Sequence, residues 1–170
     1  MRTLITYEEI SQLARPCTTD KDMAEAMIAE AQRVELKPRL GDPLYLLLLA
    51  DQPDKRFHTL LNGGEWTDCA GDARLLTGIK TALAYYTLAR ITRDGNIQET
   101  TYGSVVKDDQ YSMDPEKTER QRQYRELFSQ ADTYMAEALS YLTDQRAAFP
   151  EYKVCGKMRS NRLTIRTIGR

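Results

Sequence analysis

The side chains that most often carry out chemistry are sparse in this sequence. His58 is the only histidine, and the three cysteines, Cys17, Cys69 and Cys155, form no CxxC pair. A Ser or Cys nucleophile would have to be activated by His58, yet no GxSxG turn is present. We therefore interpret His58 as a solvent-facing or helix-capping residue and the cysteines as reduced thiols. This pattern argues against an enzyme, a zinc site and a disulfide framework, and an enzyme that depends on His58 stays open as an alternative.

Two further patterns could in principle bind a phosphate or a cation. Gly63-Gly64 is followed by no lysine and does not lie between a strand and a helix, so we interpret it as a turn. Asp20 and Asp22, like the pair Asp108-Asp109, lack the longer series of oxygen ligands and the glycine of a calcium loop. We expect solvated acidic loops at both places. The sequence thus predicts no cofactor and no metal.

The charge of the chain is unevenly distributed. The net charge of −1 comes from 24 basic and 25 acidic residues, but residues 152–170 hold six basic residues and no acidic one. Residues 1–151 therefore hold 18 basic and 25 acidic residues, a net charge of −7. The six basic residues of the tail are Lys153, Lys157, Arg159, Arg162, Arg166 and Arg170. An acidic body with a +6 tail indicates a charged partner.

The basic tail has three possible roles. It could be a disordered solubilising end, an arm that binds nucleic acid, or an arm that docks on the acidic surface of a partner. Leu163, Ile165 and Ile168 are interspersed with Thr and Arg, as in a strand that is added to another sheet. This pattern favours a protein partner, and a small DNA-binding protein that grips phosphates with its tail is the alternative function.

The remaining composition is that of one globular domain of 170 residues, with 41% hydrophobic residues. The longest apolar run, residues 44–50, is far shorter than the roughly 20 residues that cross a bilayer, and acidic residues interrupt the N-terminal segment before a secretory signal could form. We expect no membrane contact. Apolar periodicity and capping signals predict helices over 7–15, 20–34, 54–61, 71–93 and 115–145, with a turn at 37–43. The run 44–50 is apolar on every side, so periodicity cannot decide between helix and strand, and leucine rather than Val or Ile favours a short buried helix.

Several side-chain patterns support these helices. Thr6 and Glu9 form a capping-box pattern, and Asp20 precedes a helix whose apolar face we assign to Met23, Met27, Ala31 and Val34. In the segment 71–93 the apolar stripe is Leu76, Ile79, Leu83, Tyr86 and Arg90. The last helix would be about 46 Å long, against about 40 Å for the diameter of a compact chain of this length. We therefore expect an elongated molecule.

Two more features bear on partners. The polar stretch 116–125 suits a solvated helix face with pairs such as Glu116–Arg120, and a subunit contact is the alternative. Ten tyrosines against three Phe and one Trp slightly favour interfaces, since a tyrosine ring can pack while its hydroxyl reaches a polar neighbour. The helical tyrosines are Tyr85, Tyr86, Tyr124, Tyr134 and Tyr141.

Between the last two long helices, residues 96–111 are rich in Thr, Val and Tyr and predict a two-stranded ribbon or an extended loop. With the motifs Ala82-Leu83-Ala84-Tyr85-Tyr86 and Gly103-Ser104-Val105-Val106-Lys107, and a final helix from Asp114, this order of elements resembles the head–tail connector (head-completion, adaptor) proteins of tailed bacteriophages. The resemblance is strongest to versions from phages and prophages of Bacteroides-type bacteria, and it covers roughly residues 4–145.

The resemblance implies an all-α fold: a helical connector domain over residues 1–150, with two long helices, a small hairpin at about 96–111 and a basic C-terminal arm over 151–170. It also implies a virion structural protein that forms a homo-oligomeric ring, commonly a dodecamer, in the neck beneath the portal protein. The ring would extend the DNA channel and dock tail or stopper proteins, after assembly in the host cytoplasm. DNA would pass without specific binding, which suits an acidic body that repels phosphates.

Family members contact their neighbours through the hairpin and the C-terminal arm. By position, the resemblance implies partner contacts at Tyr102, Gly103, Val105, Lys107, Lys153, Lys157, Arg159, Arg162, Leu163, Ile165, Arg166, Ile168 and Arg170. The chain departs from shorter members in its segment 51–69 and in its long basic tail.

Overall fold

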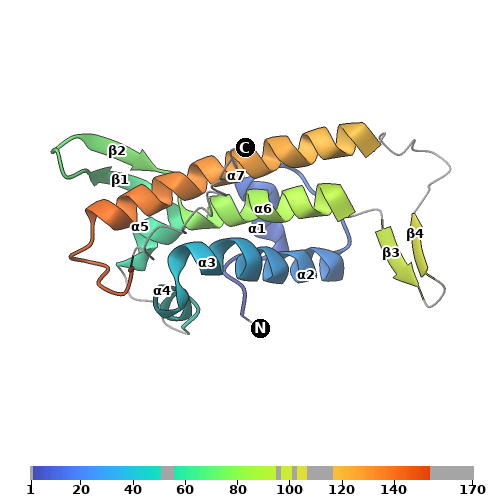
Figure 1. The fold of residues 1–170 in the computed structure, drawn as a ribbon, viewed down its shortest axis with the longest axis horizontal. Coiled ribbons are helices and arrows are strands. Elements are labelled where there is room, and N and C mark those ends of the chain that lie inside the picture. The colour runs from blue at the N-terminus through green and yellow to red at the C-terminus, as the bar shows by residue number, and fades with distance from the viewer. Residues whose placement is uncertain (1, 51–55, 95–96, 101–102, 107–116, 154–170) are drawn as a thin grey trace, which may run out of the picture.

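The helices α6 (Ile79–Asp94) and α7 (Lys117–Asp144) lie side by side along the long axis of the molecule (Figure 1). The computed structural model describes residues 2–50, 56–94, 97–100, 103–106 and 117–153. In this part the chain is mostly helical, with two small antiparallel hairpins. The other elements are α1 (Tyr7–Leu13), α2 (Lys21–Ala31), the π-helix η1 (Gln32–Leu36), α3 (Lys37–Leu40), α4 (Asp42–Leu48), α5 (Phe57–Asn62), β1 (Gly64–Thr67), β2 (Ala73–Leu76), β3 (Ile97–Thr100) and β4 (Gly103–Val106).

Helix α7 follows its predicted apolar stripe. Its 28 described residues are about 42 Å long. The buried side chains recur at helical spacing and face α6 and the N-terminal helices: Leu127, Ala131, Met135, Ala138, Tyr141 and Leu142. After the helix, Phe149 is buried and stacks on Phe57 of α5, with 5.9 Å between the ring centroids. The end of α7 is thus tied to the middle of the chain.

The two predicted N-terminal caps are confirmed. The Glu9 amide donates to Thr6 Oγ1 at 3.4 Å, and the Thr6 amide donates to Glu9 Oε2 at 2.8 Å, which completes the capping box of α1. Asp20 Oδ1 accepts from the amides of Asp22 and Met23 and caps α2. Asp20 thus serves as a helix cap.

The predicted turn at 37–43 is wrong as far as Leu40, because the helical path of α2 continues through η1 and α3. Pro38 lies directly after the π-turn, and the helical path ends at Gly41. The π-turn also inserts an extra residue into the helical repeat. Burial therefore passes from Ala31 to Leu36, and Val34 is 52% exposed.

The apolar face of the second helix also differs from the prediction before the π-turn. The buried residues of α2 are Ala24, Ile28 and Ala31, whereas Met23 and Met27 are half-buried. The short helix α4 is confirmed, but it is not buried on every side. Leu44, Tyr45 and Leu48 are buried, while Leu46 and Leu47 are exposed.

The largest correction concerns the predicted helix 71–93, whose first part is a strand. β1 and β2 form an antiparallel hairpin with Gly64 opposite Leu76, and α6 begins only at Ile79. Gly63 and Gly78 have φ values of 88° and 97° and approach each other closely: a Cβ on Gly78 would lie 2.6 Å from the Gly63 nitrogen. Both positions must be glycine for the two backbones to cross this closely. The crossing lies where the chain leaves α5 and again where it enters α6.

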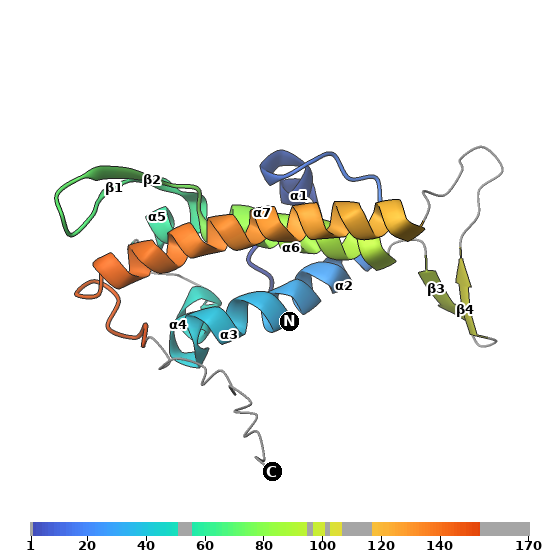
Figure 2. The ribbon, with the colours of Figure 1, turned by 45° about the horizontal axis from the view of Figure 1, so that its top comes forward.

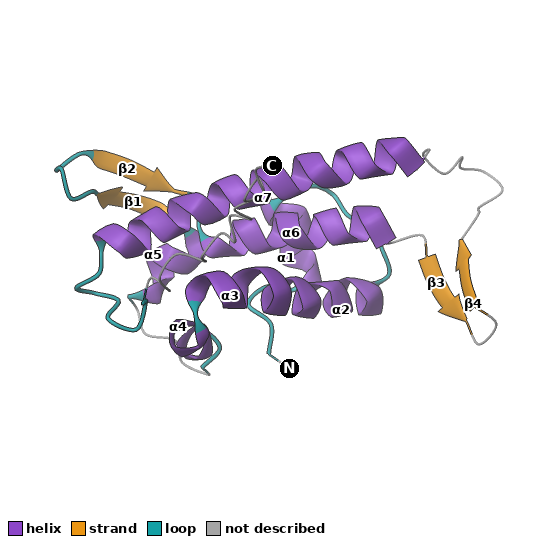
Figure 3. Cartoon of the chain, in the orientation of Figure 1, coloured by secondary structure: helices purple, strands orange, loops and turns teal. Residues whose placement is uncertain are grey.

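The second hairpin confirms the predicted ribbon over its described backbone. Ile97 of β3 pairs with Val106 of β4, and Thr100 pairs with Gly103. Both views show this hairpin beyond the end of the helical body (Figures 1 and 2). The two hairpins lie at opposite ends of the molecule (Figure 3). Of the predicted arm over 151–170, residues 154–170 lie outside the described residues. No described helix has the length and hydropathy of a membrane span.

We expect Gly78→Ala to destabilise the fold far more than Gly71→Ala. Both glycines have positive φ, 97° and 94°, so each alanine suffers the same backbone cost of about 1–2 kcal/mol. Only at position 78 does the added Cβ also meet backbone atoms, while nothing lies within 4 Å of it at position 71. The clash should add about 2 kcal/mol in urea unfolding. Equal losses for the two variants would contradict the close crossing of the two backbones.

Candidate functional site

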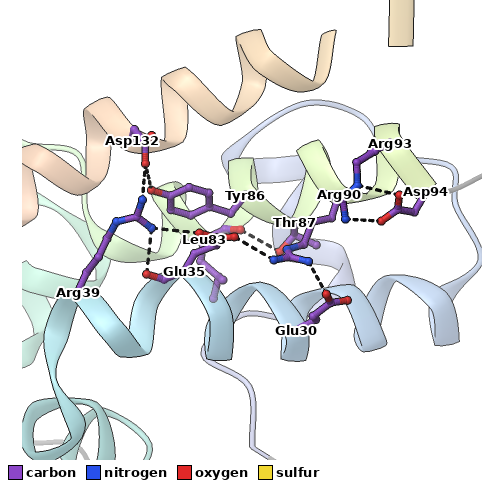
Figure 4. A network of polar contacts seen from close by, with 10 residues as sticks. All are labelled: Glu30, Glu35, Arg39, Leu83, Tyr86, Thr87, Arg90, Arg93, Asp94 and Asp132. Atoms are coloured by element: carbon purple, nitrogen blue, oxygen red, sulfur yellow. Dashed lines mark hydrogen bonds and ion pairs between the residues drawn. The ribbon is translucent and has the colours of Figure 1, made fainter. Parts of the chain in front are cut away.

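A network of charges around buried Arg90 joins three parts of the helical body (Figure 4). Arg90 of α6 is 6% exposed and donates to Glu30 of α2 and, at 2.9 Å, to Glu35 of η1. Arg39 of α3 binds Glu35 at 3.2 Å and Asp132 of α7 at 2.8 Å. The network therefore connects α2, η1 and α3 to both α6 and α7.

Tyr86 completes the network from α6. Its side chain is fully buried, its hydroxyl donates to Asp132, and its ring lies 5.1 Å from the Arg39 guanidinium carbon. Burial, followed by the hydrogen bond to Asp132, raises the pKa of Tyr86 far above its usual value. The hydroxyl is therefore a permanent donor. Neither of the two surface hollows described below is lined by these residues, so we assign the network a structural role.

A second buried polar group holds the N-terminal segment. Gln32, at the start of the π-helix, accepts from the Leu4 amide at 2.8 Å and donates to the Arg2 carbonyl and to the Tyr45 hydroxyl. Neither Gln32 nor the network of Arg90 was predicted. A signal existed for the network, because Arg90 is a cation on an otherwise apolar stripe, and a buried cation requires carboxylates nearby.

The surface is hollowed where the β1–β2 hairpin lies against α7. Two adjoining hollows of about 490 Å³ and 470 Å³ share Trp66, Arg74 and Ser140 in their lining. Trp66 and Arg74 are directly opposite each other on β1 and β2, and the Trp66 ring packs edge-on against Tyr141 of α7 at 5.4 Å. Together the two hollows form one groove under the hairpin, which we call the hairpin groove.

The tip of this hairpin is rigidly braced. Asp68 accepts from the amides of Ala70 and Asp72 through Oδ1, each at 2.9 Å, and binds Arg74 Nε through Oδ2 at 2.6 Å. The Arg74 guanidinium, aided by these amides, lowers the pKa of Asp68. Next to this ordered tip, Leu75 of β2 is 72% exposed. A well-ordered hairpin thus presents an apolar side chain to solvent.

The structure describes three of the thirteen predicted partner-binding residues. Gly103 and Val105 lie on β4, and Lys153 is exposed after α7. Strand β4 and Lys153 lie beyond opposite ends of α7, so the structure does not bring these predicted contact residues together. The other ten lie outside the described residues: Tyr102, Lys107, Lys157, Arg159, Arg162, Leu163, Ile165, Arg166, Ile168 and Arg170.

The residues considered for catalysis and metal binding lie apart. His58 is exposed on α5, as expected. Cys17 is half-buried and Cys69 is exposed at the hairpin tip, and both are free thiols. No group of three His, Cys, Asp or Glu side chains among the described residues could hold a metal ion. In the polar stretch, Glu116 lies outside the described residues, and Arg122 pairs with Glu119 and Glu126.

Comparison with known proteins gives one match. A family model described as a family of unknown function, DUF6712, matches residues 36–162. The match runs from the π-helix across both hairpins and α7. Searches of curated proteins and of solved structures find no match.

We expect Glu35→Gln to cost about 3 kcal/mol of unfolding free energy, because the Glu35 side chain is only 12% exposed and its loss leaves Arg90 and Arg39 short of a counter-charge. Glu126→Gln is the matched control. Glu126 is 52% exposed and pairs with Arg122 on the surface, so its loss should cost no more than about 0.5 kcal/mol. Chemical denaturation measures both values. If Glu35→Gln were as mild as its control, the network would not hold the helices together.

Proposed function

We propose that this chain, which belongs to the DUF6712 family, is a structural virion protein: a head–tail connector subunit of a tailed bacteriophage. In this proposal its copies form a ring beneath the portal, extend the DNA channel and dock the tail or a stopper. The finer fold is a bundle built on two long helices, with a hairpin between them and an extended arm after residue 150. The subunit has no catalytic role and requires no cofactor.

The observation that carries this proposal is the β3–β4 hairpin. It is a sheet of two strands that lies beyond the helical body. An isolated two-stranded hairpin is at best marginally stable in water and leaves an open row of N–H and C=O groups along each edge. A neighbouring copy that covers these strands would stabilise them. A hairpin in this position is therefore better suited to a subunit contact than to a monomer.

Shape and charge give further support. Helix α7 is about 42 Å long, so the two ends of the subunit are far apart and can meet different neighbours. Residues 1–151 carry a net charge of −7. Carboxylates that face a channel would repel phosphates and let DNA slide. If these acidic residues lie on the outer wall of an assembled ring, the charge gives the proposal no support.

We expect Val105→Pro to abolish assembly while the helical body still folds. Proline removes a backbone donor from β4 and is not compatible with a paired strand. Val105→Thr is the matched control, because it keeps both the donor and the β-branched shape. Particle mass and symmetry from electron microscopy, with circular dichroism as the check on folding, measure the effect.

The same measurement on the unmodified chain tests the function itself. We expect closed rings for the chain alone or with a portal protein of its phage. A chain that stays monomeric under both conditions would overturn the proposal. A ring that persists in Val105→Pro would overturn the role of the hairpin only.

The six basic residues of 152–170 favour one alternative, a DNA-binding protein that uses this tail. If all six contact phosphates, the logarithm of the binding constant should fall against the logarithm of salt concentration with a slope of roughly −5 on B-DNA. Fluorescence anisotropy with a labelled duplex at several salt concentrations measures this slope. A flat dependence, or no binding at low salt, would eliminate the alternative.

A further inference from the structure

We propose that residues 162–167, here called the arm strand, add a third strand to the free edge of β2 in the same molecule and lie over the hairpin groove. The contact forms within one subunit, so it does not depend on the assembly of a ring. It assigns an occupant to a surface that the proposed function leaves open.

The free edge belongs to β2. The Asp68 amide donates to the Asp72 carbonyl, so these two residues face each other as a hydrogen-bonded pair. Pairs alternate along an antiparallel ladder, and the backbone groups of Ala73 and Leu75 therefore point away from β1. In the described part of the chain they meet no partner, and the sheet has only two strands.

The corresponding edge of β1 is not equally open. Thr67 lies opposite Ala73, so its carbonyl also points outward, and it accepts a hydrogen bond from Gln145 beyond α7 at 3.3 Å. The edge of β2, with Leu75 beside it, is thus the place where another strand can pair. Uncovered edges of this kind aggregate, and native proteins cover or blunt them.

The charges around this edge match the arm strand. Two carboxylates of α7, Glu137 and Asp144, line the groove, and Asp72 lies at the hairpin tip on the same side of the hairpin as Arg74. The only cation of the groove lining, Arg74, is paired with Asp68. The groove is therefore acidic, and the arm strand is basic.

The faces match as well. Side chains alternate along a strand, so Leu163, Ile165 and Thr167 share one face, while Arg162 and Arg166 share the other. Added to β2, the first face lies beside exposed Leu75. The second face then turns the two arginines toward the carboxylates of the groove. The opposite orientation of the arm strand would place the arginines beside Leu75 and the apolar side chains beside the carboxylates.

The arm strand can reach this edge in its own molecule. Phe149 packs on Tyr141 at 5.6 Å, Tyr141 packs on Trp66 at 5.4 Å, and Glu151 binds Arg56 at 2.7 Å. The root of the arm is thus held close to the hairpin. The eight residues 154–161 then supply up to about 28 Å of extended chain between this root and the arm strand.

Cysteine scanning tests the contact. In a chain with Cys17→Ser, Cys69→Ser and Cys155→Ser, Ala73→Cys supplies an exposed thiol on the face that carries Leu75. A second cysteine then replaces each residue from 162 to 167 in turn. We expect a disulfide at the one of positions 163, 165 and 167 that lies opposite position 73, and none at 162, 164 and 166, within monomers on a non-reducing gel.

Each other result overturns the proposal. Equal reaction at every position indicates a tail that collides at random, and no reaction indicates a tail that lies elsewhere. Disulfide-linked dimers indicate that the arm of another copy fills the groove. Circular dichroism of every variant confirms that the body is folded.

Hydrogen exchange gives an independent readout in a chain that keeps its cysteines. We expect the double variant Arg162→Glu, Arg166→Glu to speed exchange of the Ala73 and Leu75 amides about tenfold relative to the unmodified chain. The matched control, Lys157→Glu with Arg170→Glu, changes the net charge equally outside the arm strand and should leave these amides unchanged. Equal effects of the two variants would overturn the proposed docking.

Discussion

The burial of the Arg90 guanidinium is the constraint on which the arrangement of the helices depends. A cation that is 6% exposed is tolerated only where carboxylates meet it, and Glu30 and Glu35 do so from the neighbouring helical segment. The π-turn η1 lies between these two carboxylates in the chain and carries Glu35 itself. The two ion pairs therefore help to fix the register of α2 and the π-turn against α6.

Asp132 extends the same constraint to α7. It binds Arg39 from one side and the Tyr86 hydroxyl from the other, so α7 cannot slide along α6 without leaving the buried Tyr86 hydroxyl without its acceptor. A helical body locked in this way holds its two ends at a fixed separation. Each end carries a two-stranded hairpin, and in the part of the chain that the structure describes neither hairpin gains a third strand. A stable centre with the two-stranded β3–β4 hairpin beyond it supports the proposal that the chain is part of an assembly.

The sequence was sufficient to predict an element of the fold wherever the local signals for that element agreed with each other. The capping box at Thr6 and the stripe of α7 needed no distant partner, and both were confirmed. The first hairpin was missed because Leu76 and Ile79 continue a helical spacing, whereas the close approach of Gly63 and Gly78 is made between residues far apart in sequence. The π-turn was also missed, and Glu35, which it carries, meets its partner Arg90 on another helix.

The same distinction applies to the candidate site. Composition revealed an acidic body and a basic tail, but it could not show where on the body the tail belongs. Attraction between them is strong only within a Debye length of about 10 Å, so charge alone brings the tail to the surface without choosing a place. The choice requires directional backbone groups, which the edge of β2 supplies through Ala73 and Leu75. An alternating segment such as Leu163 to Ile165 can use that edge, whereas a uniformly basic tail could not. Charge thus sets the approach of the arm, and the strand edge sets its position.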